Sequence, residues 1–208
     1  MSQPENRRPL TSRNSAWAAK LASWAVSREI TPNQISQASM GFAAAGFFFY
    51  AVSTQGGIVQ FLALLLAAAT LQARLVCNLI DGMVAVEGGR GAKDGPFWNE
   101  APDRVSDLQF FAGAGLAAGQ PELGLLAAAL AIATAYIREL GRAEGFPPDF
   151  SGPLAKPQRM AVLTVGTVLA AFYASEWTLT VTLWTVVAGT AATLLRRSWT
   201  LIERLKSR

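Results

Sequence analysis

The stretch NLIDGMVAVEGGRGAKDGPFWNEAPDRVSD, residues 78–107, gathers acids, amides and glycines in a chain of 208 residues that is 51% hydrophobic. Residues three or four apart lie on the same side of a helix, so helical spacing sorts its polar and small residues into two faces. The first face holds Asn78, Asp81, Gly82 and Ala85, and the second holds Asn99, Asp103 and Asp107. A short glycine-rich loop joins the two helices and lets the faces oppose each other. We therefore expect oxygen-bearing side chains from two helices to converge on one small volume.

Converging carboxylate and amide oxygens are suited to a hard divalent cation such as Mg²⁺ or Mn²⁺. The small residues Gly82 and Ala85 leave room for a ligand to approach the backbone. The alternative is a solvated acidic loop between two membrane spans. The helical spacing of the acids favours a binding site, because ionisable groups at membrane depth are costly and usually functional.

The rest of the chain predicts a membrane protein. Three long windows are almost free of charge: residues 30–74, which reach their first charge at Arg74, and residues 108–137 and 160–195, which contain only Glu122 and Glu176. A spanning helix needs about 20 mainly apolar residues, and each window is interrupted near its middle by a turn-forming stretch. The three interruptions read STQGG, GQPELG and ASEW. Each window therefore predicts a helical hairpin, which gives an all-α protein with six transmembrane helices.

We expect the spans at residues 35–52, 58–77, from about 97, 123–141, 159–175 and 179–195. Residues 1–13 are expected to be disordered, and residues 14–29 to form an amphipathic juxtamembrane helix at the interface, with a packed helix on the bundle as an equal alternative. The membrane domain covers residues 30–197, and a basic tail covers residues 198–208. Thr31 and Pro32 mark the start of the first span.

The basic residues predict the orientation. None of the 18 Lys and Arg residues lies in the three hairpin turns, whereas they flank the motif and both ends of the chain. By the positive-inside rule, both termini and the motif face the cytoplasm of a multi-pass protein in the inner cell membrane. The net charge of +4 then indicates attraction to anionic lipid rather than to nucleic acid.

Two composition counts narrow the chemistry. The chain has no His and a single Cys, Cys77. These counts exclude a Ser-His-Asp triad, a His general base, a zinc site with His ligands and an internal disulfide. The first residues are polar, and no signal peptide is expected.

At residues 78–103 the sequence resembles the CDP-alcohol phosphatidyltransferase family, whose motif is Asp-x2-Asp-Gly-x2-Ala-Arg-x8-Gly-x3-Asp-x3-Asp. The spacing matches throughout. Its second and fourth acids and its small residues are present, as Asp81, Gly82, Ala85, Gly95 and Asp103. Three positions depart from it, because Asn78 and Asn99 replace Asp and Val86 replaces Arg. The stretches TPNQIS, YIRELGRAEG and KPQRMAV also resemble segments of the family.

The resemblance implies transfer of a phosphatidyl group from a CDP-alcohol, with CDP-diacylglycerol expected, to an acceptor hydroxyl in phospholipid biosynthesis, with release of CMP. It also implies Mg²⁺ or Mn²⁺, a homodimer, and a general base at Asp103. The implied metal ligands are Asn78, Asp81, Asn99 and Asp103. The implied CDP-binding residues are Asn33, Asp81, Gly82, Ala85 and Gly95. Arg138, Arg142 and Arg159 are expected to bind the phosphate of the acceptor or lipid, with topology anchors as the alternative.

The two Asn residues leave alternatives open. Asn keeps one ligand oxygen but removes a negative charge, so the affinity for a divalent cation should fall. The chain is then an enzyme with one metal or a weaker second one, a CDP-lipid-binding or regulatory protein, or an inactive membrane partner. Glu100 or Asp107 is a candidate for supplying missing charge, although Glu100 points about 100° away from Asn99. The acceptor alcohol is open, and the cluster of arginines favours a phosphorylated one.

Overall fold

The computed structural model describes residues 15–87 and 93–208. In these two ranges all regular structure is helical, and no strand is present. The helices are α1 (Ala16–Ser27), α2 (Pro32–Ser53), α3 (Gly57–Glu87), α4 (Gly95–Ala117), α5 (Pro121–Ala143), α6 (Lys156–Phe172) and α7 (Ser175–Lys206). The residues expected to be disordered, 1–13, and the glycine-rich part of the motif loop lie outside the described ranges.

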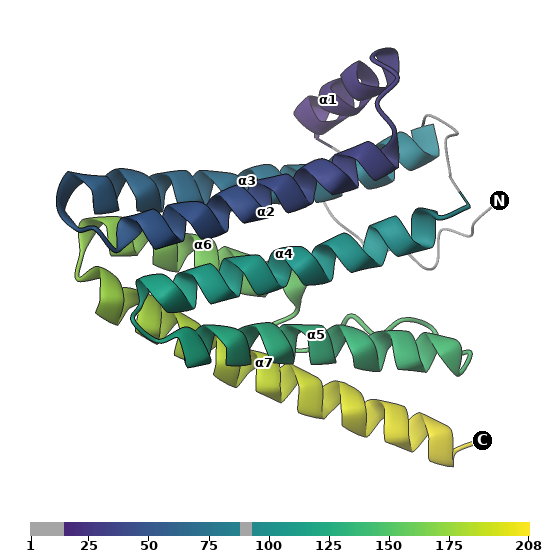
Figure 1. Ribbon diagram of the computed structural model, residues 1–208. Helices are drawn as coiled ribbons and strands as arrows, with labels where there is room; N and C mark the ends of the chain where they lie inside the picture. Colours follow the sequence, from purple (N-terminus) through teal and green to yellow (C-terminus); the bar gives the residue numbers. More distant parts are fainter. Residues whose placement is uncertain (1–14, 88–92) are drawn as a thin grey trace.

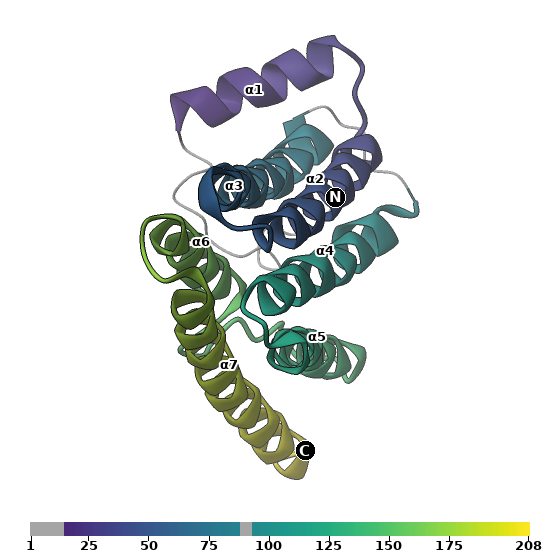
Figure 2. The ribbon, with the colours of Figure 1, turned by 60° about the vertical axis from the view of Figure 1, so that its left-hand side comes forward.

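Six of the helices form a bundle that closes on itself (Figures 1 and 2). Around the bundle, α3 contacts α2, α2 contacts α4, α4 contacts α5, α5 contacts α7, α7 contacts α6, and α6 returns to α3. A continuous apolar core, with Tyr50, Phe110 and Phe111 fully buried, fills the bundle. The motif helices α3 and α4 are joined along the chain but lie on either side of α2.

The predicted helix starts and turns have clear local causes. The Thr31 side chain accepts a hydrogen bond from the backbone of Gln34, and the Gln34 side chain accepts one from the backbone of Thr31. This capping box satisfies backbone donors that a helix N-terminus leaves free. The first hairpin turn uses Gly56 and Gly57, at φ of 78° and 58°, and the second uses Gly119, at 65°. Glycine adopts this left-handed backbone without steric cost.

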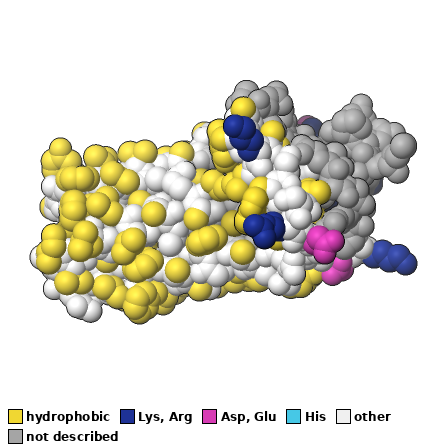
Figure 3. All heavy atoms as spheres, turned by 90° about the horizontal axis from the view of Figure 1, so that it is seen from above, with side chains coloured by type: hydrophobic (Ala, Val, Ile, Leu, Met, Phe, Trp, Pro, Cys, Tyr) yellow, Lys and Arg dark blue, Asp and Glu magenta, His cyan; other side chains and the backbone are white. Residues whose placement is uncertain are grey.

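Four helices are long and apolar enough to cross a membrane, counting only described residues: α2, α3 over Gly57–Ala85, α5 and α7. The first half of α4 carries the acids of the motif, and α6 has 17 residues. Figure 3 shows the face formed by α1, α2 and α3, where hydrophobic side chains cover most of the bundle's length and charged side chains gather at one end. The protein is an all-α membrane protein, as the sequence predicted.

Helix α1 lies outside the bundle, near the end where the charges gather (Figure 1). Its buried side consists of Ala18, Ala22 and Ala25, which pack against the last turns of α3 and the start of α2. Trp17 and Trp24 point away from this contact and are about half exposed. The helix therefore packs on the bundle through alanines and presents tryptophans outward.

Candidate functional site

The two motif faces meet between α3 and α4. The Asn78 amide donates a hydrogen bond to Asp103 Oδ1 at 2.8 Å. One turn further along α3, Asp81 accepts a hydrogen bond from the Ser36 hydroxyl of α2 at 3.1 Å. Asp81 and Asp103 are close enough to interact electrostatically. Three helices therefore position two carboxylates and one amide on a common volume.

Asp103 is surrounded by cations. Arg74 Nη2 lies 2.9 Å from Asp103 Oδ1, Lys156 Nζ bonds Oδ2, and Arg104 Nη2 lies 3.6 Å from Oδ2. The Asp103 side chain is 13% exposed, so it remains accessible from one direction. The carboxylate is thus oriented by hydrogen-bond donors from α3 and α6 and by an ion pair within α4.

A buried ionic layer continues inward from this carboxylate. Arg74 and Asp107 are completely buried, with Arg74 Nη2 3.3 Å from Asp107 Oδ1. Arg159, also buried, lies 3.6 Å from the other Asp107 oxygen. Buried charges are tolerated when they are paired, so the three residues tie α3, α4 and α6 together below the candidate site.

The glycines of the motif border open space. A methyl group built on Gly82 or on Gly95 would meet no described atom within 4 Å. Ala85 is half-buried on the same side of α3 as Asp81. Gly82 and Gly95 therefore border space beside the carboxylates, and the use of that space by a ligand stays a prediction.

Two amide residues predicted for the site lie at its margin. Asn99 is exposed, one turn before Asp103 on α4, and the structure does not bring it to the carboxylates through a hydrogen bond. Asn33 donates to both carboxylate oxygens of Asp94 at 3.2 Å, and Trp98 donates to the same carboxylate at 2.9 Å. Asn33 thus links the start of α2 to the start of α4.

A small basic pocket opens beside Asp103. It is lined by Arg104, Thr134, Ala135, Arg138, Phe150, Lys156, Arg159 and Arg197. Five of these side chains are cationic, and Lys156 is both a wall of the pocket and a hydrogen-bond donor to Asp103. The pocket suits the anionic group of a small molecule whose other atoms extend to the carboxylate of Asp103.

The structure separates the three arginines that the sequence singled out for phosphate. Arg138 and Arg159 line the basic pocket. Arg142 does not line it, because it is exposed and pairs with Glu139 at 2.8 Å. Glu100 does not join the carboxylate cluster either, because it pairs with Arg138 and Arg104.

Sequence reasoning missed Arg74, Arg104, Lys156 and Arg197. Arg74 and Arg197 carried a signal, since they stand next to long charge-free windows. A charge at the edge of an apolar helix more often pairs inside the bundle than contacts lipid. Lys156 opens the stretch KPQRMAV, whose resemblance to the family was a signal, whereas Arg104 lies among the charged residues of the motif and had none.

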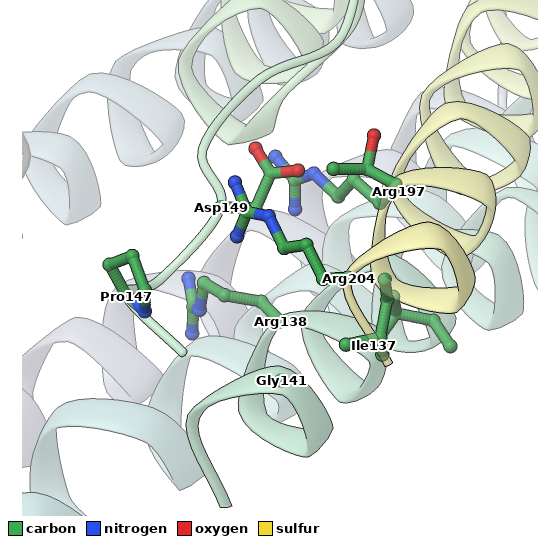
Figure 4. Close-up of a pocket in the computed structure, with 9 residues that line it drawn as sticks. Ile137, Arg138, Gly141, Pro147, Asp149, Arg197 and Arg204 are labelled. Carbon is green, nitrogen blue, oxygen red and sulfur yellow. The ribbon is translucent and has the colours of Figure 1, made fainter. Parts of the chain in front are cut away.

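A second hollow lies next to the basic pocket, between α5, α7 and the connection at residues 144–155. Figure 4 shows Arg138, Arg197 and Arg204 with Asp149 around it. Burial works against the charged form of Asp149, but hydrogen bonds from Ser151, with help from Arg197 and Arg204, lower its pKa overall. Arg197 also donates to the Ser151 carbonyl at 2.9 Å and the Thr134 carbonyl at 3.1 Å. The connection is thereby fixed against α5 and α7.

Comparisons with known proteins agree with this arrangement. No family model matches the sequence. The chain is 29% identical over 133 residues to a phosphatidylinositol phosphate synthase of Mycolicibacterium smegmatis, covering 59% of each chain. It is 28% identical over 177 residues to one of Corynebacterium glutamicum, covering 81% of this chain and 76% of the relative. The match thus spans about three-fifths of the length of the first relative and three-quarters of the second.

Solved structures share the fold. The Mycobacterium tuberculosis phosphatidylinositol phosphate synthase with CDP-DAG bound superposes with a TM-score of 0.75 at 19% identity, covering 90% of this chain and 94% of that one. The same enzyme with manganese and citrate gives a TM-score of 0.73 at 20% identity, with 88% of each chain covered. These likenesses confirm the predicted resemblance to the CDP-alcohol phosphatidyltransferase family. The meaning of Asn at two motif positions stays a prediction.

The family's motif implies a divalent cation, and the donors of this chain fit one in kind. Asp81, Asp103 and Asn78 offer hard oxygen ligands of the sort that Mg²⁺ and Mn²⁺ prefer. Among the described residues, no group of three or more His, Cys, Asp or Glu is placed to hold a metal ion. The reason is that two of the four motif positions carry Asn in this chain. Asp81, Asp103 and Asn78 therefore offer the oxygen ligands that a divalent cation prefers, but with only two negative charges.

Proposed function

We propose that the protein transfers the phosphatidyl group of CDP-diacylglycerol to the hydroxyl of a phosphorylated alcohol, with release of CMP, in phospholipid biosynthesis. The observation that carries this proposal is the contact between the basic pocket and the motif. Lys156 lines the pocket together with Arg138 and Arg159 and also bonds Asp103. An acceptor phosphate held by these cations brings its hydroxyl toward the carboxylate, and the relatives' name, phosphatidylinositol phosphate synthase, supports a phosphorylated acceptor.

The roles of the site residues follow from their placement. Asp103 accepts the proton of the acceptor hydroxyl, whose oxygen attacks the phosphorus next to the diacylglycerol. The new P–O bond forms as the bond from that phosphorus to the CMP oxygen breaks, and CMP leaves with the electron pair. Asp103 is suited to this role by its position, because a general base must lie within hydrogen-bond reach of the acceptor hydroxyl and Asp103 adjoins the basic pocket. Arg74 and Asn78 orient its carboxylate.

We assign the divalent cation, Mg²⁺ or Mn²⁺, to Asp81, Asp103 and Asn78, with Asn99 at the open end of the same face. When bound, the ion offsets the negative charge that develops on the diphosphate. The manganese in the structure of the mycobacterial enzyme supports this choice. Gly82, Ala85 and Gly95 leave space for the CDP moiety, and Asn33 borders that space from α2.

The membrane arrangement belongs to the same proposal. Helices α2 to α7 are taken as six spans, with α4 and α6 shielded from lipid where they carry polar residues. Trp17 and Trp24 of α1 lie at the membrane interface. Both termini and the site face the cytoplasm from the inner cell membrane, and the protein is a homodimer, as the resemblance implies.

A second function is favoured by one specific observation. Asn replaces Asp at positions 78 and 99, and the described donors are poor in charge. In this alternative the protein binds a CDP-lipid without turning it over and acts as a binding or regulatory protein.

The experiment that separates the two functions is CMP release from CDP-diacylglycerol by the purified protein in detergent. The assay uses Mn²⁺ and a panel of acceptors, including inositol phosphate, glycerol 3-phosphate and serine, with Asp81→Ala as the inactive control. Release that depends on Mn²⁺ and on a phosphorylated acceptor supports the transferase. No release with any acceptor, combined with heat protection by CDP-diacylglycerol, supports the binding protein.

A further inference from the structure

Arg74 holds an unusual place among the charged residues of the site. It lies one turn before Asn78 on α3, at the end of the first charge-free window. Its side chain is completely buried, and one nitrogen, Nη2, contacts both Asp103 and Asp107. Its Nε and Nη1 have no hydrogen-bond partner among the described residues. Burying a guanidinium with unpaired donors destabilises the folded state. We therefore expect the positive charge of Arg74 to have a role at this position.

The negative charges around Arg74 are already offset by side-chain cations without any metal ion. Asp81, Asp103 and Asp107 bring three negative charges to the cluster. Arg74, Lys156, Arg104 and Arg159 bring four positive charges within 3.6 Å of Asp103 or Asp107, and Arg104 also pairs with Glu100. Two divalent cations a few ångströms apart need several carboxylates between them to offset their repulsion. This cluster has no surplus of carboxylates for two such ions.

The neutral side chain of Asn78 is consistent with a site whose negative charges are already offset. Its amide donates to Asp103 Oδ1 at 2.8 Å, and Arg74 Nη2 donates to the same oxygen at 2.9 Å. A carboxylate at position 78 would place a second negative charge against that oxygen. Two adjacent carboxylates, at position 78 and at Asp103, are stable with a cation between them. The neutral amide of Asn78 is stable beside Asp103 without such a cation.

We infer that the Arg74 guanidinium supplies the fixed positive charge that a second divalent cation would otherwise bring to Asp103, so that the site binds a single divalent cation. The inference rests on the proposed function, which assigns that cation to Asp81 and Asp103. Arg74 is then a positioning residue: it acts through Asp103 and does not contact the substrate. Asn78 and Asn99 then accompany the positive charge of Arg74, because a site with one metal ion needs fewer carboxylates. They do not indicate lost activity.

The test counts Mn²⁺ bound per chain, measured from the electron paramagnetic resonance signal of free Mn²⁺ during titration of the purified protein in detergent. Four proteins are compared: the wild type, Asn78→Asp, the charge-balanced double variant Arg74→Gln/Asp107→Asn, and that double variant with Asn78→Asp added. Arg196→Gln, which removes an exposed arginine of α7, is the control for a general loss of charge.

We expect one Mn²⁺ in the wild type, in Arg196→Gln and in Asn78→Asp, with tighter binding in the last. We expect two Mn²⁺ only when Arg74→Gln/Asp107→Asn is combined with Asn78→Asp. Two ions in the wild type or in Asn78→Asp overturn the inference but leave the proposed transferase standing. No bound ion in the wild type removes the metal from the proposed function as well. One ion in the folded triple variant overturns the inference as well. If the variants that lack Arg74 do not fold, two ions in Asn78→Asp still overturn the inference, because Arg74 is intact there.

Discussion

At the scale of single residues, Asp103 concentrates the chemistry of the site. Within the described part of the chain, it is the one carboxylate that contacts Asn78, Arg74 and Lys156 together, and it lies beside the basic pocket. We predict that Asp103→Asn abolishes turnover, because the amide keeps the shape and loses the proton acceptor. The measurement is the rate of CMP release at saturating CDP-diacylglycerol.

The control for this prediction is Glu122→Gln, which changes an exposed carboxylate in the first turn of α5. Glu122 lies next to the hairpin turn that follows α4, whereas Asp103 lies in the first half of α4, and the Glu122 variant should keep full activity. Substantial turnover by a folded Asp103→Asn protein would contradict the role of Asp103 as base.

Arg138 and Arg142 offer a matched pair one turn apart on α5. Only Arg138 lines the basic pocket, whereas Arg142 is exposed and pairs with Glu139. A hydrogen bond to a charged group contributes about 1.5–3 kcal/mol, which corresponds to roughly a 10- to 150-fold change in binding. We predict that Arg138→Gln raises the KM for a phosphorylated acceptor within that range and that Arg142→Gln leaves it nearly unchanged. Equal effects of the two variants in steady-state kinetics would argue that the pocket does not hold the acceptor.

The residue scale also shows what the sequence can and cannot predict. Helical spacing and the motif were enough to predict that Asn78, Asp81 and Asp103 face one another, because that prediction needs only local geometry. The positions of Lys156 and Arg197 depend on how α6 and α7 return to the motif. Those contacts are between residues far apart in sequence, and no local pattern encodes them.

At the scale of helices, the α4–α5 hairpin depends on a close contact between Gly115 and Gly124. A methyl group on Gly124 would lie 2.4 Å from the Phe111 carbonyl oxygen and 2.8 Å from Gly115 Cα. Overpacking of this kind costs about 1–3 kcal/mol. We predict that Gly124→Ala lowers the Tm of the purified protein by several degrees in a thermal unfolding assay.

The matched control is Gly41→Ala in α2, where an added methyl group meets no atom within 4 Å. Alanine is the better helix former by about 1 kcal/mol, so this variant should be as stable as the wild type or slightly more so. If Gly124→Ala were equally well tolerated, the two helices would not approach as closely as the structure places them.

Most helix boundaries were predictable, because charge-free windows and turn residues are local signals. The extent of one helix was not: α7 continues to Lys206 through the segment read as a basic tail. Helix α3 extends beyond the apolar window through the first half of the motif, as the helical spacing of Asn78, Asp81 and Ala85 predicted. Basic residues are good helix formers, so a loss of hydropathy ends a membrane span without ending the helix.

At the scale of the whole molecule, the proposed orientation places the three hairpin turns on one side of the membrane and the C-terminus on the other. The chain has a single cysteine, Cys77, which Cys77→Ser removes. In that background, Gln55→Cys and Gln120→Cys report on two turns, and Ser207→Cys reports on the tail. We predict that a membrane-impermeant maleimide labels the two turns in intact spheroplasts and labels the tail only after lysis. Labelling of the tail before lysis would reverse the orientation.

The proposed activity of the whole molecule is to join a phosphorylated alcohol to a phosphatidyl group. The most direct measurement follows ³²P from a labelled phosphorylated acceptor into the organic phase, in the presence of CDP-diacylglycerol and Mn²⁺, while CMP is quantified in the same sample. We predict that label enters the lipid in equal amount to the CMP released, and that Asp81→Ala does neither. CMP release without label in the lipid would mean hydrolysis rather than transfer, and the absence of both with every acceptor tested would contradict the proposed enzyme.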